Sequence, residues 1–329
     1  MDAAVEAVFA RPAEHGISLA LYALVDGELI VERYGRQPAN AFQDALDVSA
    51  DTALISWSMA KSMVHAAVGI LVGDGVLDPQ APAAVPEWSG TDKAAIRLID
   101  LLEMRSGLRF VEDYVGGAAS DCLEMLYGEA AADMAAFAAA LPLDHPPGTV
   151  WNYSSGSTNI VSRIVGDAVS GGPGGRAAAR RAATEEFLDT RLFGPLGMTS
   201  ATPKFDDAGT WVGSSYVYAT AADFARFGEL YRLDGVLADG TRVLPAGWLD
   251  HARTQVASDP ETGFRYGRHW WMWPGYPGSL AAHGYEGQFT IVVPDRRLTL
   301  VHLGKTDAAV RPHLVELLAG VIGAIEGSA

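Results

Sequence analysis

The sequence predicts an α+β fold in which an antiparallel sheet is built from both chain ends, is flanked by helices, and carries a mostly helical inserted region. Three observations support this prediction. A strand-like hairpin follows the first residues, the middle of the chain has apolar residues at helical spacing, and strand-like segments return after about residue 263. We expect one unit over residues 1–329, with a sheet region at about 1–55 and 260–329 and a helical region at about 56–259.

The strands are predicted from alternation and turn residues. "ISLALYALVDGELIVERYG" is typical of two strands joined at Asp26-Gly27, because Asp-Gly favours a tight hairpin turn. Near the other end, the expected strands are "FRYGRHWWMW", "GQFTIVVPD" and "RLTLVHLG".

The helices are predicted from apolar spacing and from stop signals. The N-terminal segment "MDAAVEAVFARPAEHG" resembles an amphipathic helix, and "KAAIRLIDLLEMRSGL" is expected to be helical up to Gly107. Thr220 is placed to cap the helix in "TAADFARFGELYRLDG". Three further helices are expected in "AADMAAFAAALPL", "STNIVSRIVGDAVSGGPGG" and "VRPHLVELLAGVIGAIEG".

Charge and composition exclude several classes of protein. The net charge of -16 opposes binding to nucleic acid and to an anionic membrane surface. No stretch approaches the ~20 apolar residues of a membrane span, and the N-terminus lacks the basic start of a signal peptide, so we expect a cytoplasmic location. The single cysteine, Cys122, allows no internal disulfide. The histidines show no metal-ligand spacing and no dinucleotide or Walker pattern is present, so we expect no metal and no cofactor.

Ser58 and Lys61 stand at positions i and i+3 in "ISWSMAKSMVHAAVGILVGDG", which places them on one face of a predicted helix. This short pattern also arises by chance on surface helices. However, the helix is almost wholly apolar after Lys61, and lysine is rarely buried without a partner. Burial disfavours the charged form of an amine, so Lys61 is a candidate base that activates the Ser58 hydroxyl.

Two later segments carry residues that could act together with Ser58 and Lys61. Tyr153 follows a Pro-Gly turn and precedes a predicted helix in "PPGTVWNYSSGSTNIVSRIVG", where it could share proton transfer with Lys61. His283 and Gly284 lie in "AAHGYEGQFTIVVPD", a glycine-rich turn followed by a strand.

Together these segments resemble the serine β-lactamase and penicillin-binding-protein superfamily, whose first motif is S-x-x-K. The order S-x-x-K, tyrosine, glycine-rich strand is similar to that of the class C branch. The chain from about residue 17 most resembles the 6-aminohexanoate-dimer hydrolases and related esterases. This closer likeness rests on "SMAKSMVHAAVGILVGDGVLDPQAP", "LLEMRSGLRFVEDY", "NYSSGSTNIV", "GRHWW" and "HGYEGQFTIVVPD". The resemblance implies a β-lactamase/transpeptidase-like fold.

The resemblance also implies roles for individual residues. Ser58 would be the acyl-accepting nucleophile, and Lys61 and Tyr153 would form the proton-transfer pair. The amides of Ser58 and Tyr285 would form the oxyanion hole, with Glu286 as the alternative donor if the register differs by one residue.

Substrate contacts are implied for Tyr114, Ser214 and His283. The last of these stands where the wider superfamily has the lysine of K-T-G, which helps to bind the substrate carboxylate. The absence of this lysine argues against efficient β-lactam hydrolysis. Ser155 also replaces the asparagine that the wider pattern has two residues after the tyrosine.

The sequence therefore predicts a serine hydrolase that cleaves a small-molecule ester or amide through an acyl-enzyme. The alternatives are a DD-peptidase, D-aminopeptidase or β-lactamase activity and, from another class, a catalytically silent binding homologue. The sequence leaves the oligomeric state open.

Overall fold

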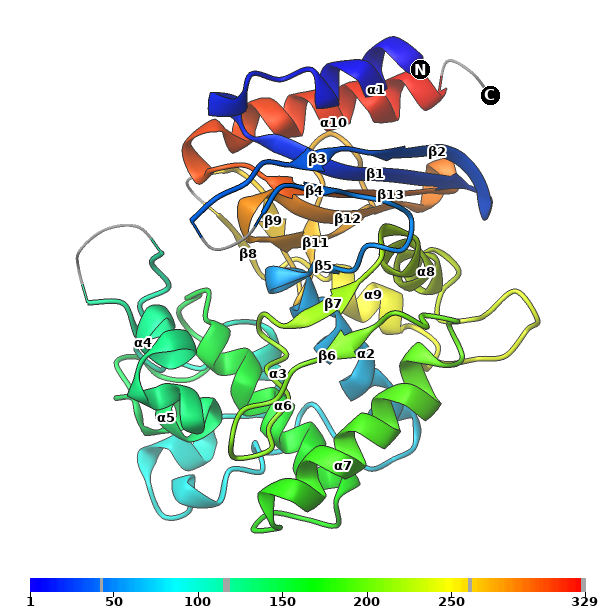
Figure 1. Ribbon diagram of the computed structural model, residues 1–329. Coiled ribbons are helices and arrows are strands. Elements are labelled where there is room, and N and C mark those ends of the chain that lie inside the picture. Colours follow the sequence, from blue (N-terminus) through cyan, green and yellow to red (C-terminus); the bar gives the residue numbers. More distant parts are fainter. Residues whose placement is uncertain (42–43, 115–118, 260–261, 327–329) are drawn as a thin grey trace.

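The structure is a computed structural model and describes residues 1–41, 44–114, 119–259 and 262–326. Its elements are arranged in layers (Figure 1). Helices α1 (Asp2–Phe9) and α10 (Arg311–Glu326) lie together on one face of the large sheet, and α8 (Ala221–Arg232) packs on the other face. The remaining helical region extends away from the sheet beyond α8.

The large sheet has eight antiparallel strands in the order β2-β1-β13-β12-β11-β10-β9-β8. Its strands are β1 (Ile17–Val25), β2 (Glu28–Tyr34), β8 (Ala257–Ser258), β9 (Arg265–Tyr266), β10 (Trp271–Met272), β11 (Leu280–Gly284), β12 (Gln288–Val293) and β13 (Leu298–Lys305). Strand β1 pairs with β13 along its whole length, from Ile17 opposite Lys305 to Val25 opposite Leu298. The predicted fold class is therefore confirmed, because both chain ends supply the sheet.

The predicted turn between β1 and β2 forms at Asp26 and Gly27. Both residues have positive φ angles, 55° and 80°, as a two-residue hairpin of the favoured hand requires. Glycine adopts such an angle without steric cost, and aspartate tolerates it better than most residues.

Helices dominate the inserted region. They are α2 (Ala60–Gly73), α3 (Leu98–Leu102), α4 (Asp121–Tyr127), α5 (Met134–Ala140), α6 (Ser155–Val169), α7 (Ala177–Leu188) and α9 (Trp248–Arg253), besides α8. The predicted cap is present, since the Thr220 side chain accepts the Asp223 N–H at 3.3 Å. Two small sheets join β3 (Arg36–Gln37) to β4 (Leu46–Asp47), and β5 (Leu54–Ile55) to β7 (Val217–Ala219) and β6 (Thr202–Pro203).

Two predicted elements are wrong in extent. The helix expected in "KAAIRLIDLLEMRSGL" is reduced to α3, because the chain turns at Met104, which has a φ of 56°. The single strand expected in "FRYGRHWWMW" is divided into β9 and β10, and His269 between them has a φ of 57°.

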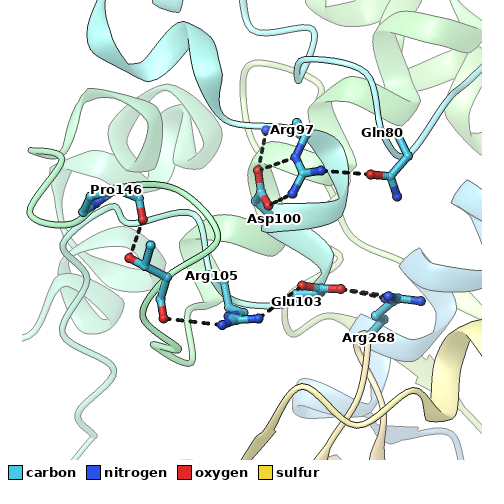
Figure 2. A network of polar contacts seen from close by, with 8 residues as sticks. Gln80, Arg97, Asp100, Glu103, Arg105, Pro146 and Arg268 are labelled. Carbon is cyan, nitrogen blue, oxygen red and sulfur yellow. Dashed lines mark hydrogen bonds and ion pairs between the residues drawn. The ribbon is translucent and has the colours of Figure 1, made fainter.

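A polar network lies where the two segments meet (Figure 2). Asp100 of α3 accepts the backbone N–H of Arg97 at 2.9 Å and its side-chain N–H groups at 2.8 and 3.2 Å, which closes the start of this short helix. Glu103, at the end of α3, pairs with Arg268 between β9 and β10 at 2.9 Å. Arg105 lies 3.8 Å from the same carboxylate. The network ties the helical region to the sheet.

The core is divided by the sheet into two clusters. One cluster contains buried residues of α2, α6 and α8 against β1 and β13, and the other contains α1 and α10 against the opposite face. Strand β12 is buried throughout, and it buries the polar side chains of Gln288 and Thr290 along with its apolar residues.

By length and composition alone, the stretch Ala308–Ile325, with a mean hydropathy of 1.5, could cross a membrane. It coincides with α10, whose residues Leu314, Leu318 and Val321 are fully buried against the sheet. One such helix is weak evidence for a span, and 28% of this stretch is buried inside the protein.

Candidate active site

Ser58 lies in a 3-10 turn, Trp57–Met59, that leads directly into helix α2. The chain reaches this turn from β5, and the Ser56 N–H donates to the Val217 carbonyl on β7 at 2.8 Å. Trp57 has a φ of 43°, a left-handed conformation that a bulky residue rarely adopts. Such strain persists only where the surroundings enforce it, and it is concentrated at functional sites.

Lys61 lies one helical turn after Ser58, and only 1% of it is exposed. Its Nζ is 2.9 Å from each of three oxygens: Ser58 Oγ, Ser155 Oγ and the Ser214 carbonyl oxygen. The sequence predicted that this lysine would be buried beside Ser58. The structure adds that two other segments, the start of α6 and the loop before β7, hold its amine.

Tyr153 reaches the same place from the residues before α6. The helix start is fixed by Ser154, whose hydroxyl accepts the Ser157 N–H at 3.0 Å. Lys61 Nζ lies 5.0 Å from the centre of the Tyr153 ring. Burial raises the pKa of Tyr153, and the nearby Lys61 opposes this rise. The structure thus brings Ser58, Lys61 and Tyr153 together, and their catalytic roles stay predictions.

Glu112 is a residue of this site that sequence reasoning missed. Its carboxylate accepts the Ser155 N–H at 2.7 Å and the Ser155 hydroxyl at 2.6 Å, and it also accepts the Tyr114 hydroxyl. Glu112 lies 43 residues before Ser155 in the chain, so no local spacing links the two. The only signal in the sequence is that Glu112 stands two residues before Tyr114 in "VEDY".

Strand β11 brings the predicted oxyanion-hole segment to Ser58. A Cβ atom on Gly284 would lie 2.4 Å from the Ser56 carbonyl oxygen, so glycine is needed for this approach. Tyr285 follows directly and lines the same cavity as Ser58. The side chain of Glu286 turns aside and accepts the Trp57 Nε1–H at 3.2 Å. The backbone N–H of Tyr285, with that of Glu286 as the alternative, stays the predicted second amide donor.

The cavity beside Ser58 has a volume of about 470 Å³. Its walls combine aromatic and charged side chains. The aromatic residues are Tyr114, Trp151, Tyr153, Trp271 and Tyr285, and the charged residues are Glu112, Asp113, Asp259 and Arg311. Burial lowers the pKa of Arg311, and its Nε has no hydrogen-bond partner among the described residues.

Two of the three predicted substrate contacts lie on this cavity. The Tyr114 ring stacks on the Tyr285 ring with centroids 4.8 Å apart. His283 stacks on Phe289 at 4.5 Å, and its Nε2 is buried without a hydrogen-bond partner in the described chain. Burial lowers the pKa of His283 to about 3, so its ring is neutral near pH 7.

Ser214, the third predicted contact, is placed differently. Its side chain is fully buried, and its hydroxyl lies 3.0 Å from the Ser215 hydroxyl. Only its carbonyl oxygen reaches the site, where it accepts a hydrogen bond from Lys61. The substrate contact predicted for Ser214 stays a prediction, and its side chain is not among those that line the cavity beside Ser58.

No group of three or more histidine, cysteine, aspartate or glutamate side chains that could hold a metal ion occurs among the described residues.

The relatives found by comparison with known proteins agree with the resemblance seen in the sequence. The sequence profile of the beta-lactamase family matches residues 4–318. A 6-aminohexanoate-dimer hydrolase of Paenarthrobacter ureafaciens is 27% identical over 287 residues, which are 80% of this chain and 69% of that protein. Penicillin-binding protein 4 of Amycolatopsis lactamdurans is 30% identical over 324 residues, 86% of this chain and 79% of that protein.

The fold is also shared with solved structures. A family VIII carboxylesterase superposes with a TM-score of 0.69 and 17% identity, and the match covers 96% of this chain and 95% of that chain. At this level of identity the likeness concerns the fold alone.

Proposed function

Because this chain belongs to the beta-lactamase family of serine hydrolases, we propose that it cleaves small esters or amides through an acyl-enzyme on Ser58. The observation that carries the proposal is the 2.9 Å contact between Ser58 Oγ and Nζ of Lys61, a lysine that is almost fully buried. A serine hydroxyl is a weak nucleophile until a neighbouring base takes its proton. The buried amine is such a base when it is neutral.

The remaining groups suit the steps of acyl transfer. Ser58 Oγ would attack the carbonyl carbon, and the amides of Ser58 and Tyr285 would stabilise the oxygen that becomes negative. The proton from Ser58 would pass to Lys61 and then, with help from the Tyr153 hydroxyl, to the leaving oxygen or nitrogen. Water would release the acyl group by the same path in reverse.

The cavity supports a substrate class. A volume of about 470 Å³ suits a small molecule, and its aromatic walls suit an apolar acyl chain. Arg311 offers a guanidinium whose Nε is unpaired among the described residues, so we propose that preferred substrates carry a carboxylate. His283 and Tyr114 would contact the substrate between this end and Ser58.

The relatives support both chemistries. One is named for hydrolysis of the 6-aminohexanoate dimer, an amide, and another for carboxylesterase activity. One acylation site serves both because the attack and the oxyanion hole are common to the two reactions. We propose ester hydrolysis as the activity that is detected first.

A penicillin-binding or β-lactamase activity is the main alternative, and it is favoured by the similarity to penicillin-binding protein 4. His283 argues against it, because its neutral ring puts no charge at the position where the wider superfamily has the lysine of K-T-G. Intact mass after incubation with benzylpenicillin distinguishes the two, because the proposal predicts neither a benzylpenicillin adduct on the protein nor hydrolysis of the benzylpenicillin.

The proposal is tested by hydrolysis of short-chain p-nitrophenyl esters, with Ser58→Ala as the matched variant. We expect turnover by the wild type, loss of at least about a thousandfold in kcat for Ser58→Ala, and an unchanged melting temperature. Esters of equal length with and without a terminal carboxylate test the proposed substrate class. Absence of turnover together with absence of fluorophosphonate labelling at Ser58 would instead support a silent binding homologue.

A further inference from the structure

The hydrogen bonds around Lys61 can be assigned directions. The Ser214 carbonyl oxygen can only accept, so one N–H of Lys61 points to it. Ser155 Oγ lies 2.6 Å from the Glu112 carboxylate, which accepts its hydrogen, so Ser155 Oγ is itself an acceptor toward Lys61. Acylation by Ser58 requires Lys61 as a neutral amine, and in that form both of its hydrogens are committed to these two acceptors. The third position of the amine, toward Ser58 Oγ at 2.9 Å, is then left for the lone pair.

We propose that Glu112 is a positioning residue that works through Ser155 to keep the Lys61 lone pair on Ser58. A serine hydroxyl rotates freely and can donate or accept, unlike an amide side chain, whose oxygen is always an acceptor. Ser155 stands where the wider superfamily has asparagine, so the direction of its hydrogen bond must be set by another group. Glu112 sets it, because it holds both the N–H and the hydroxyl of Ser155.

Without Glu112, the Ser155 hydroxyl is free to turn its hydrogen toward the Lys61 lone pair. Ser155 would then compete with Ser58 for the base. In the intact site, the Ser58 proton moves to Nζ while Oγ bonds to the carbonyl carbon, and the same proton leaves with the alcohol or amine. Glu112 takes no part in these bonds. This inference rests on the proposed acyl transfer and assigns to the site a residue that touches neither nucleophile nor base.

The first test is Glu112→Gln, measured by steady-state ester hydrolysis. The glutamine can hold either the N–H or the hydroxyl of Ser155, and its own amide hydrogens can point at Ser155 Oγ. We expect kcat to fall by about tenfold to a hundredfold, less than the ~10²–10⁴-fold that a general base typically contributes, because Lys61 is still present but is misdirected for part of the time. KM should stay within about threefold, since a misdirected base does not weaken substrate binding.

A double-mutant cycle separates positioning from a general structural role. If Glu112 acts through Ser155, then Glu112→Gln combined with Ser155→Ala should be no slower than Ser155→Ala alone, within about threefold. If the losses in kcat of the two single variants multiply in the double variant, the proposal is overturned. Ser155→Ala by itself should lower kcat as much as Glu112→Gln does, which keeps the idea testable if Glu112→Gln does not fold.

The matched control is Glu124→Gln, the same substitution on helix α4, where Glu124 accepts the Ala130 N–H at 3.4 Å. Its kcat should equal that of the wild type. If the Ser58→Ala variant is as active as the wild type, the proposed function as a whole is overturned. Activity that is lost in Ser58→Ala but unchanged in Glu112→Gln would overturn only the role of Glu112.

Discussion

At Gly284 the end of β11 passes so close to Ser56 that a Cβ atom would lie 2.4 Å from the Ser56 carbonyl oxygen. The same hypothetical atom would lie 2.9 Å from the Gln288 side chain. A methyl group here must push β11 away from the turn that carries Ser58, and Tyr285 would move with it. The site therefore requires a close approach between the backbones at Gly284 and Ser56, as well as its reactive side chains.

Gly284→Ala tests this requirement. We expect kcat to fall at least about tenfold and the free energy of unfolding to fall by roughly 1–3 kcal/mol, as overpacking typically costs. Ester kinetics and denaturant unfolding measure the two effects. Gly320→Ala on α10 is the control, because no atom lies within 4 Å of its added Cβ and alanine favours a helix. Normal kinetics in Gly284→Ala would contradict the account.

Single residues differ in how far the sequence reveals them. Lys61 was predictable because a lysine in an apolar helix requires an explanation within its own segment. Glu112 was not, because its partner Ser155 lies 43 residues away and the two meet only through tertiary packing. Ser214 was predicted by likeness as a substrate contact, and the structure shows in addition that its backbone oxygen accepts a hydrogen bond from Lys61, which no sequence pattern indicated.

Among the elements, α3 and the strands β9 and β10 depend on each other. Glu103 at the end of α3 and Arg268 between the two strands form an ion pair whose side chains are only 12% and 17% exposed. Apolar spacing predicted a longer helix and a longer strand, because it is blind to such a pair. Elements with strong local signals, namely the β1–β2 hairpin, α8 with its Thr220 cap, and α10, formed as predicted.

Glu103→Gln should lower the free energy of unfolding by roughly 1–3 kcal/mol, because it leaves the Arg268 charge poorly compensated in a partly buried place. Denaturant titration measures the change. Asp47→Asn is the control: its pair with Arg36 has side chains 77% and 61% exposed, and exposed pairs contribute about 0–1 kcal/mol. Equal effects of the two substitutions would contradict the structural role given to the Glu103–Arg268 pair.

For the whole molecule, the sheet made from both chain ends could be predicted because strand signals lie at both ends and helical signals lie between them. The strand order could not, since pairing of β1 with β13 spans nearly the entire chain. Burial across this fold also sets its response to acid. It lowers the pKa of His251, His269 and His283 to about 3 and that of His302 to about 4.

These histidines should make the protein less stable in acid. In the unfolded chain they bind protons below about pH 6.5, whereas the folded protein keeps them neutral down to about pH 3–4. Their contribution is complete above pH 6.5 and declines as the pH falls, by up to about 1.4 kcal/mol per histidine and pH unit. Asp206 acts in the opposite sense, because burial raises its pKa to about 6.

The melting temperature should therefore fall steadily between pH 7 and pH 4, since several histidines outweigh one aspartate. His15→Gln should leave the dependence unchanged, because His15 is exposed. A melting temperature that stays constant or rises over this range would contradict the assignment of these side chains as neutral in the folded protein.

The central claim is that Ser58 carries an acyl group during turnover. The most direct measurement is rapid acid quenching of the enzyme during hydrolysis of a p-nitrophenyl ester, followed by intact mass and peptide mapping. The account predicts an added mass equal to the acyl group on the peptide that contains Ser58, and no such mass in Ser58→Ala. Turnover without an adduct, or an adduct on another residue, would contradict it.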